Sequence, residues 1–269
     1  MRSPIITVMS NTAIKAGKIL LRDFGEVDQL QISRKGTSNF VTKTDLKVEK
    51  LLHKELKLAR PEFGFLMEEG GAIEGADPTH RWIIDPVDGT NNLIHAVPYF
   101  CISIGLEHTV KPGLTEIIAG VIYDPIHNEM FTAELYKGAF LNDRRLATSA
   151  RDVMDTAMLV TGNPRYAVNN TKPFDLLKAA SQSGATIRHS GASALDLAYV
   201  AAGRYDGCWY AGLEPWDAAA GMLLVKEAGG MLTQIDGSAA SPYGKTLLAT
   251  NQPLHGRVMK LLAGSHTDH

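Results

Sequence analysis

Apolar residues recur at helical spacing across residues 5–24, which predicts an amphipathic helix that packs against a core. Residues 29–45 then alternate in polarity around a central glycine, a pattern typical of a short β-hairpin or an extended arm. A second helix is predicted over residues 46–58, with Asp45 as its N-terminal cap. The chain is therefore predicted to begin with two helices on either side of a short β-rich arm.

Short strands dominate the pattern that follows. Apolar runs predict strands at residues 63–67 and 81–85, and β-rich runs between residues 99 and 140, separated by turn sequences, predict an antiparallel meander. After about residue 151, short strands alternate with helices, which favours a mixed or parallel α/β arrangement. The strands predicted there cover residues 157–162, 185–190, 206–210, 230–235 and 246–250, and the helices residues 173–183, 192–203, 216–228 and 254–262. We expect an α/β (α+β) fold with an N-terminal α+β half, residues 1–148, and a C-terminal α/β half, residues 149–269.

Composition and charge exclude several classes of protein. The 269 residues are 45% hydrophobic and 21% charged, so the chain is neither disordered nor collagen-like. With 27 Lys and Arg against 29 Asp and Glu, the net charge is −2, and no general basic field exists to hold nucleic acid or anionic lipid. A polyanionic ligand would therefore need a local site or a metal.

The cysteines and the N-terminal segment indicate a cytoplasmic protein. Cys101 and Cys208 lie far apart and lack metal-ligand spacing, so we predict two buried, reduced thiols. The first residues lack the continuous apolar stretch of a secretion signal. No run of roughly 18 apolar residues occurs, so no membrane span is expected.

The most informative segment joins a predicted strand to a tight turn. The strand delivers Asp85 to its end, and Pro86 is expected to stop the ladder because proline lacks an N–H group and fixes φ. Asp88 and Gly89 turn the chain, so two carboxylates lie on one bend with the Val87 carbonyl able to point the same way. Oxygen ligands crowded in this manner suit Mg²⁺. Taken alone, the same string is more often a solvated turn.

Two further acidic positions carry the same ambiguity. Glu68 and Glu69 follow an apolar strand, where functional groups are common, yet alone they are typical of a solvated strand end. Asp217 follows Trp216 at the start of a predicted helix and is either a helix N-cap or a member of an acidic cluster. Both interpretations hold together only if its side chain turns away from the backbone.

Three motifs that contain acidic residues follow one another along the chain. They are Glu68-Glu69, Asp85-Pro-Val-Asp88-Gly-Thr90, and Trp216-Asp217-Ala-Ala-Ala-Gly221 followed by Glu227-Ala-Gly-Gly230. In their order, their spacing and the total length of the chain, they resemble the inositol monophosphatase family. This family is part of the lithium-sensitive, magnesium-dependent phosphatase superfamily. The likeness spans nearly the whole chain. It implies a layered αβαβα sandwich whose active site lies between the two halves.

The resemblance also implies a set of metal ligands. Glu68, Asp85 and the main-chain carbonyl of Val87 would bind a first Mg²⁺. Asp85, Asp88 and Asp217 would bind a second ion, with Asp85 bridging the two. Glu68 would help to hold a loosely bound third ion through water. Most ligands would thus come from the N-terminal half, and Asp217 from the C-terminal half.

Catalytic and substrate-binding roles follow from the same likeness. Thr90 and Asp45 resemble the family's water-activating pair, with Glu68 as a further catalytic residue. Gly89 and Thr90 would offer backbone N–H groups to the phosphate. The remaining substrate contacts would come from Gly191, Ala192, Ser193, Tyr210 and Asp217, the first three forming the loop that touches a sugar-like ring.

Two positions depart from the family pattern. Asn91 replaces the second threonine of the usual D-G-T-T-N string, and we expect little effect. Tyr210 stands where inositol-preferring members often carry a glutamate that accepts hydrogen bonds from ring hydroxyls. Tyrosine can still form hydrogen bonds there, or it can serve as a packing aromatic on a strand, so the departure bears on substrate preference rather than on phosphatase chemistry.

The expected function is therefore a cytoplasmic, Mg²⁺-dependent phosphomonoesterase that hydrolyses inositol monophosphate or related polyol and sugar phosphates through an activated water. A 3′(2′),5′-bisphosphate nucleotidase and a fructose-1,6-bisphosphatase are alternatives with the same chemistry. An alternative of another class is a regulatory protein of transcription and ribosomal-RNA processing. The resemblance implies a small phosphorylated substrate, a homodimer and sensitivity to lithium. The net charge and the hydropathy pattern predict no membrane partner and no direct binding of nucleic acid.

Overall fold

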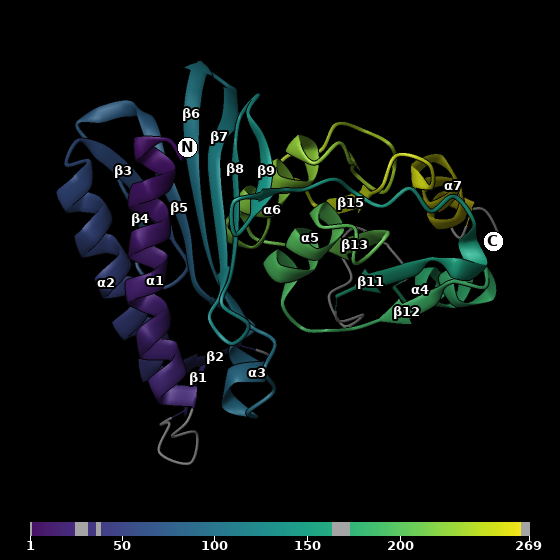
Figure 1. Ribbon diagram of the computed structural model, residues 1–269, viewed down its shortest axis with the longest axis horizontal. Coiled ribbons are helices and arrows are strands. Elements are labelled where there is room, and N and C mark those ends of the chain that lie inside the picture. The colour runs from purple at the N-terminus through teal and green to yellow at the C-terminus, as the bar shows by residue number, and fades with distance from the viewer. Residues whose placement is uncertain (1, 25–31, 36–38, 163–172, 265–269) are drawn as a thin grey trace.

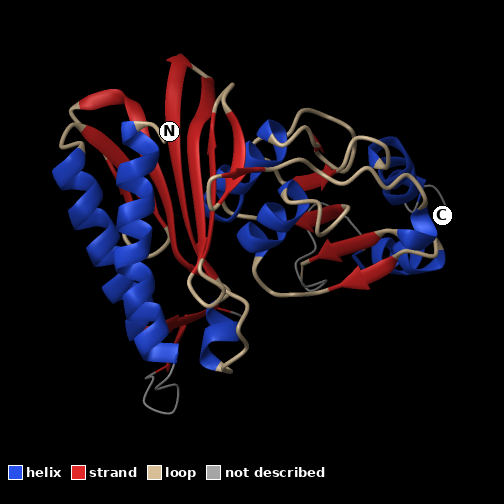
Figure 2. Ribbon diagram, in the orientation of Figure 1, coloured by secondary structure: helices blue, strands red, loops and turns tan. Residues whose placement is uncertain are grey.

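Five layers of secondary structure, alternately helical and sheet, build the computed structural model, which describes residues 2–24, 32–35, 39–162 and 173–264. Helices α1 (Pro4–Phe24) and α2 (Lys43–Ala59) cover the outer face of an eight-stranded sheet (Figure 1). Helices α5 (Ser193–Ala201) and α6 (Pro215–Glu227) lie between this sheet and a five-stranded sheet. Helices α4 (Pro173–Gln182) and α7 (His255–Gly264) cover the far side. The expected αβαβα sandwich is confirmed, and Figure 2 shows its helices and strands in separate colours.

The eight-stranded sheet contains the expected meander. Its order is β10-β9-β8-β7-β6-β5-β3-β4, and all neighbours are antiparallel except β3 and β5. The strands are β3 (Phe63–Met67), β4 (Gly71–Ile73), β5 (Asp77–Asp88), β6 (Cys101–Lys111), β7 (Leu114–Asp124), β8 (Glu129–Glu134), β9 (Gly138–Leu141) and β10 (Arg144–Arg145). The short edge strands β4 and β10 were not predicted, because three and two residues carry no periodic signal.

The expectation that Pro86 ends a strand at Asp85 is wrong. Strand β5 continues to Asp88, and its pairing with β6 shifts register between Asp85 and Asp88. The shift is a bulge, in which a proline costs no ladder hydrogen bond. The Val87 N–H group donates instead to the Asp85 carboxylate at 2.8 Å. The bulge therefore turns side chains and a carbonyl toward the end of the strand without ending it.

The N-terminal elements largely follow the expected pattern. Strands β1 (Ile32–Lys35) and β2 (Asn39–Thr42) pair antiparallel, which confirms the hairpin; residues 29–31 and 36–38 of the expected range lie outside the described residues. Helix α2 begins at Lys43, three residues before the expected start, so Asp45 lies within its first turn and is not its cap. Asp45 is nevertheless buried, because α2 places it toward the interior.

The five-stranded sheet is mixed, as expected. Its order is β12-β11-β13-β15-β14, with β11 parallel to both of its neighbours and β15 antiparallel to both of its own. The strands are β11 (Met158–Thr161), β12 (Thr186–Arg188), β13 (Gly207–Ala211), β14 (Met231–Thr233) and β15 (Thr246–Thr250). Helices α4 to α7 start and end within two residues of their expected positions. Both cysteines are free and buried, which confirms that prediction.

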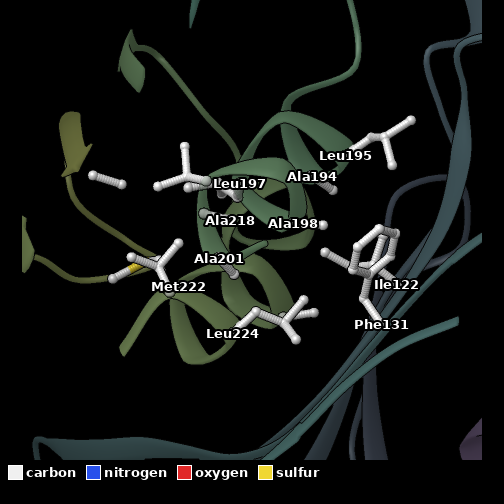
Figure 3. Close-up of a cluster of buried hydrophobic side chains, with 14 of the residues drawn as sticks. Ile122, Phe131, Ala194, Leu195, Leu197, Ala198, Ala201, Ala218, Met222 and Leu224 are labelled. Atoms are coloured by element: carbon white, nitrogen blue, oxygen red, sulfur yellow. The ribbon is translucent and has the colours of Figure 1, made fainter. Parts of the chain in front are cut away.

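A buried apolar cluster joins the two sheets through α5 and α6. Ile122 and Phe131 of the large sheet face the helices, and Leu195, Ala198 and Leu224 meet them from α5 and α6 (Figure 3). A second cluster fills the space between the large sheet and helices α1 and α2. Because the first cluster draws residues from both predicted halves of the chain, the halves share a core; their division at residue 148 stays a prediction.

Small residues allow α6 to approach the large sheet closely. Gly105 of β6 and Gly120 of β7 are paired across the strands. A Cβ atom on Gly105 would lie 3.2 Å from the Ala219 Cβ, and one on Gly120 would lie 3.0 Å from the Ala220 carbonyl oxygen. The Ser103 hydroxyl also donates to the Trp216 carbonyl at 3.1 Å. These contacts fix the start of α6 above the end of β5.

Replacement of Gly120 by alanine should therefore destabilise the protein. The added methyl group would meet α6 backbone that cannot move aside cheaply, and we expect a loss of about 1–3 kcal/mol in the free energy of unfolding, measured by denaturant titration. Gly256→Ala is the matched control, since nothing lies within 4 Å of a Cβ atom there. Equal stabilities for the two variants would contradict the close contact between α6 and the sheet.

Candidate active site

Three carboxylates from distant parts of the sequence meet where β5 ends and α6 begins. Asp85, Asp88 and Asp217 each offer an oxygen, and these oxygens all lie within 4.8 Å of one another. The first two residues belong to β5, and the third belongs to α6. Asp85 and Asp88 are buried, and Asp217 is partly buried. This convergence is the arrangement that the acidic motifs predict, and it is unlike a solvated turn.

The structure resolves the two interpretations of Asp217. Glu214 is the N-cap of α6, and Asp217 is the third residue of the helix, so Asp217 is not the N-cap. Its carboxylate accepts a hydrogen bond of 2.9 Å from the Glu214 N–H group, one side of a capping box. The same side chain reaches the cluster with Asp85 and Asp88. One carboxylate therefore stabilises the helix end and joins the acidic cluster.

Asp88 is held by the N-terminus of α5. Its carboxylate accepts hydrogen bonds from the backbone N–H groups of Ser193, Ala194 and Leu195 at 3.2, 2.6 and 3.4 Å. The Ser193 hydroxyl donates to it at 3.4 Å. Free N–H groups and the helix dipole at this end favour a negative charge. Asp88 is thus a β5 residue whose support comes from the C-terminal part of the chain.

Glu68 lies beside the three aspartates, just after β3. It is not among the three residues whose oxygens lie within 4.8 Å of one another, and its side chain remains accessible to solvent. Partial removal from water, followed by the charges of Asp217 and Asp45, raises its pKa to about 8. Glu68 therefore lies close enough to the cluster to share its electrostatic field.

The pKa values of the aspartates are raised as well. Burial raises the pKa of Asp85 well above its usual range, with the charges of Glu68 and Asp88 adding to the effect. Burial and then the charge of Asp217 raise the pKa of Asp88 to about 8. Burial raises the pKa of Asp217 to about 6. Within the described part of the chain, no salt bridge joins a basic side chain to these carboxylates or to Glu68.

Such a donor set fits a hard divalent cation. The ligands on offer are carboxylate oxygens, with the Val87 carbonyl on the same bulge, and these are the atoms that Mg²⁺ prefers. A cation would also relieve the repulsion that raises the pKa values. The cluster could therefore bind metal.

Thr90 and Asp45 come together as their sequence pattern predicts. The Thr90 hydroxyl lies 3.4 Å from an Asp45 carboxylate oxygen and 3.0 Å from the Val87 carbonyl. Thr90 begins the short helix α3 (Thr90–Ile94), and Gly89 before it has a φ of 97°. A Cβ atom on Gly89 would lie 3.0 Å from the Tyr99 carbonyl oxygen, so both conformation and space require glycine. The Thr90 hydroxyl can donate to only one of these two acceptors at a time, so it can rotate between them.

The expected substrate loop leads into α5. Gly191 has a φ of 85°, Ala192 is the buried N-cap, and Ser193 is the first helical residue. Tyr210 lies on β13 with 4% of its surface exposed, and its hydroxyl donates to Asp196 at 2.5 Å. Contact of Tyr210 with a substrate stays a prediction.

Three residues in this region were not predicted from the sequence. Asp196, Asn92 and Tyr99 form hydrogen bonds that join the α3 region to α5. A usable signal existed for Asp196, because it is the lone charged residue in the apolar sequence Ser193–Ala201. Asn92 and Tyr99 carry no such signal, since their partners lie on segments that only the fold brings together.

Comparisons with known proteins agree with the geometry. Residues 1–267 match the model described as "Inositol monophosphatase family". The chain is 44% identical over 260 residues to an inositol-1-monophosphatase of Mesorhizobium japonicum, covering 96% of each chain. It is 37% identical to the Nus factor SuhB of Escherichia coli K12, covering 98% of this chain and 96% of that protein. The crystal structure of the extragenic suppressor protein SuhB from Bartonella henselae superimposes with a TM-score of 0.91 at 45% identity, covering 97% and 98%.

The raised pKa values predict a definite pH dependence of stability. A carboxyl whose folded-state pKa exceeds its unfolded value of about 4 stabilises the fold at low pH and loses that contribution as the pH rises. With pKa values of about 8 for Glu68 and Asp88, the metal-free melting temperature should fall between about pH 4 and pH 8. Mg²⁺ should raise it, and more at pH 8 than at pH 6, because binding requires the ionised carboxylates.

Thermal melts with EDTA or with millimolar MgCl₂, the ionic strength matched with KCl, measure both effects. Asp88→Asn is the comparison variant and should show a shallower pH dependence. A metal-free melting temperature that rises across this interval, or an equal response to MgCl₂ and KCl, would contradict the acidic-cluster interpretation.

Proposed function

Since this chain belongs to the inositol monophosphatase family, we propose that it is a Mg²⁺-dependent phosphomonoesterase of inositol monophosphates or related polyol and sugar phosphates. The family membership and the curated relatives support a phosphatase, and the family is metal-dependent. The single observation that carries the proposal is the meeting of Asp85, Asp88 and Asp217, with oxygens within 4.8 Å of one another. Few structural needs explain three like charges placed so close together, two of them at buried positions and one at a partly buried position.

The proposed ligand sets follow the sequence motifs. Glu68, Asp85 and the Val87 carbonyl would hold one cation, and Asp85, Asp88 and Asp217 a second. A third, weakly held ion would be bound through Glu68. Divalent cations in such sites neutralise phosphoryl oxygens and lower the pKa of a coordinated water. The donor set is entirely oxygen, which supports Mg²⁺ over softer metals.

The chain's own residues would orient the reactants. Thr90, with Asp45 behind it as the acceptor, would orient the attacking water and relay its proton to Asp45. The backbone N–H groups of Gly89 and Thr90 would bind phosphoryl oxygens. Asp88, held by α5, would keep the carboxylates of β5 aligned as charge develops in the transition state. Water would then displace the alcohol in line, and no side-chain nucleophile would be required.

Substrate selection would depend on the loop of Gly191, Ala192 and Ser193, with Asp217 and Tyr210 beside it. Tyr210 is buried against Asp196, so an acidic acceptor for ring hydroxyls is lacking at that position. We therefore place polyol and sugar phosphates beside inositol monophosphate as candidate substrates. Activity on 3′(2′),5′-bisphosphate nucleotides or on fructose 1,6-bisphosphate is the alternative within the same chemistry.

A regulatory role is a second candidate function. The relative at 37% identity carries the name Nus factor SuhB, and the superimposed Bartonella structure is titled extragenic suppressor protein SuhB. The net charge of −2 argues against direct binding of nucleic acid, so such a role would act through a protein partner. Retention of the acidic cluster supports catalysis alongside any such role.

The proposed setting is a cytoplasmic homodimer that lithium inhibits. No helix in the described ranges combines the length and apolarity required to cross a bilayer. Size-exclusion chromatography with light scattering tests the dimer, and titration of LiCl into the assay tests the inhibition.

Phosphate release from a substrate panel tests the function. The panel is inositol 1-phosphate, fructose 1,6-bisphosphate, adenosine 3′,5′-bisphosphate and glycerol 2-phosphate, each assayed with Mg²⁺, with EDTA, and with Mg²⁺ plus Li⁺. We expect Mg²⁺-dependent release from inositol 1-phosphate or glycerol 2-phosphate. Release from none of the four would favour the regulatory role instead.

Asp85→Asn should abolish most of this activity. Removal of a residue that merely supports a metal ligand costs about 10–100-fold, so loss of a bridging carboxylate should lower kcat at least as much. Asp236→Asn is the control, because Asp236 is an exposed loop carboxylate that accepts hydrogen bonds from Ser238. Comparable turnover in the two variants would remove Asp85 from the catalytic site.

A further inference from the structure

A second buried carboxylate, Asp196, lies on α5 close to Asp88 but outside the metal cluster. Its side chain is 1% exposed, and it accepts hydrogen bonds from the hydroxyls of Tyr99, Ser190 and Tyr210 at 2.6, 2.5 and 2.5 Å. No salt bridge to it occurs among the described residues. Burial raises its pKa to about 6, against the lowering effect of the three hydroxyls. Burial of a carboxylate costs free energy, so the presence of Asp196 at this position indicates a structural or functional role.

The three donors come from different segments of the fold. Tyr99 lies in the connection between α3 and β6, Ser190 precedes the substrate loop, and Tyr210 lies on β13. The Asn92 side-chain amide reinforces the junction, since it donates to the carbonyls of Tyr99 and Ser190 at 2.7 and 2.8 Å. The first turn of α5 is therefore fixed to both parts of the chain through Asp196.

That same first turn holds Asp88. The backbone donors to Asp88 are residues 193–195, directly before Asp196 in the helix. The 2.6 Å hydrogen bond from Ala194 requires the helix end to be placed within a few tenths of an ångström. The position of α5 thus decides where the Asp88 carboxylate points.

We propose that Asp196 is a positioning residue for the metal site: its hydroxyl network fixes the N-terminus of α5, which orients Asp88. The metal-binding part of this inference rests on the proposed function. Asp196 acts on Asp88 through the backbone N–H groups of α5, in addition to the repulsion between the two negative charges. Asp196 and Tyr210 therefore contribute to the site without touching the phosphate.

Hydrogen exchange tests the positioning without any metal. In Asp196→Asn, the amides of residues 193–195 should exchange at least about ten times faster than in the wild-type protein, measured with EDTA present. Asp206→Asn is the matched control: Asp206 is 0% exposed and accepts hydrogen bonds from Met158 N–H and from Arg151, away from the first turn of α5. It should lower the melting temperature and leave exchange at residues 193–195 unchanged relative to the rest of α5.

Calorimetric titration with MgCl₂ tests the consequence for the site. We expect Asp196→Asn to weaken Mg²⁺ binding about 10-fold or more, as for residues that orient metal ligands, and Asp206→Asn to bind as the wild type does. The double variant Tyr99→Phe/Tyr210→Phe keeps the Asp196 carboxyl group and removes two of its three hydroxyl donors. It should weaken Mg²⁺ binding and also speed exchange at residues 193–195, whereas weaker binding with wild-type exchange there would indicate a purely electrostatic effect of Asp196 and contradict the positioning role. The double variant also tests the proposal if Asp196→Asn fails to fold.

The outcomes separate the two proposals. Wild-type exchange at residues 193–195 in Asp196→Asn, or an equal rise in Asp206→Asn, overturns the positioning role. Unchanged Mg²⁺ affinity in both the asparagine and the double variant overturns it as well. A wild-type protein that binds no Mg²⁺ overturns the proposed function instead, and the exchange experiment then still decides the role of Asp196.

Discussion

Mutual repulsion of buried carboxylates is the constraint on which this structure depends. Asp85, Asp88 and Asp217 are held together against their charges, and the fold supplies each with a backbone donor. Val87 donates to Asp85 from the bulge, Ala194 to Asp88 from α5, and Glu214 to Asp217 from its own helix end. These hydrogen bonds offset part of the electrostatic cost and fix the oxygens in a pattern that suits a hard cation.

Close packing of α5 and α6 against the large sheet brings these carboxylates together. Helix α6 can bring Asp217 to the end of β5 because paired glycines, Gly105 and Gly120, leave room for its alanine face. Helix α5 lies beside it in the same layer, between the two sheets, and the apolar cluster of Figure 3 holds both helices in place. The middle layer of the sandwich is thus where hydrophobic packing and the acidic site meet, so stability and site geometry depend on the same contacts.

Local patterns predicted most of the elements, and the motifs predicted which acids converge. Periodicity identified the helices and the meander, because each buries one face along a continuous segment. Two expectations were wrong for a physical reason: a bulge lets β5 continue past Pro86, and α2 begins at Lys43, so Asp45 lies in its first turn. The sequence left two interpretations of Asp217 open, and the outcome depends on Glu214, the N-cap of α6. The network around Asp196 could not be predicted, since its donors are Tyr99, Ser190 and Tyr210, which only the tertiary fold assembles. The individual roles of the site residues stay predictions.

The support of Asp88 by α5 has a consequence for the order in which the molecule is built. During translation, β5 leaves the ribosome about a hundred residues before the N–H groups of residues 193–195. The nascent chain therefore carries Asp85 and Asp88 without their later partners, and the acidic cluster cannot be complete until α5 and α6 have been synthesised and docked. The topology thereby delays assembly of the acidic cluster until most of the chain has been synthesised.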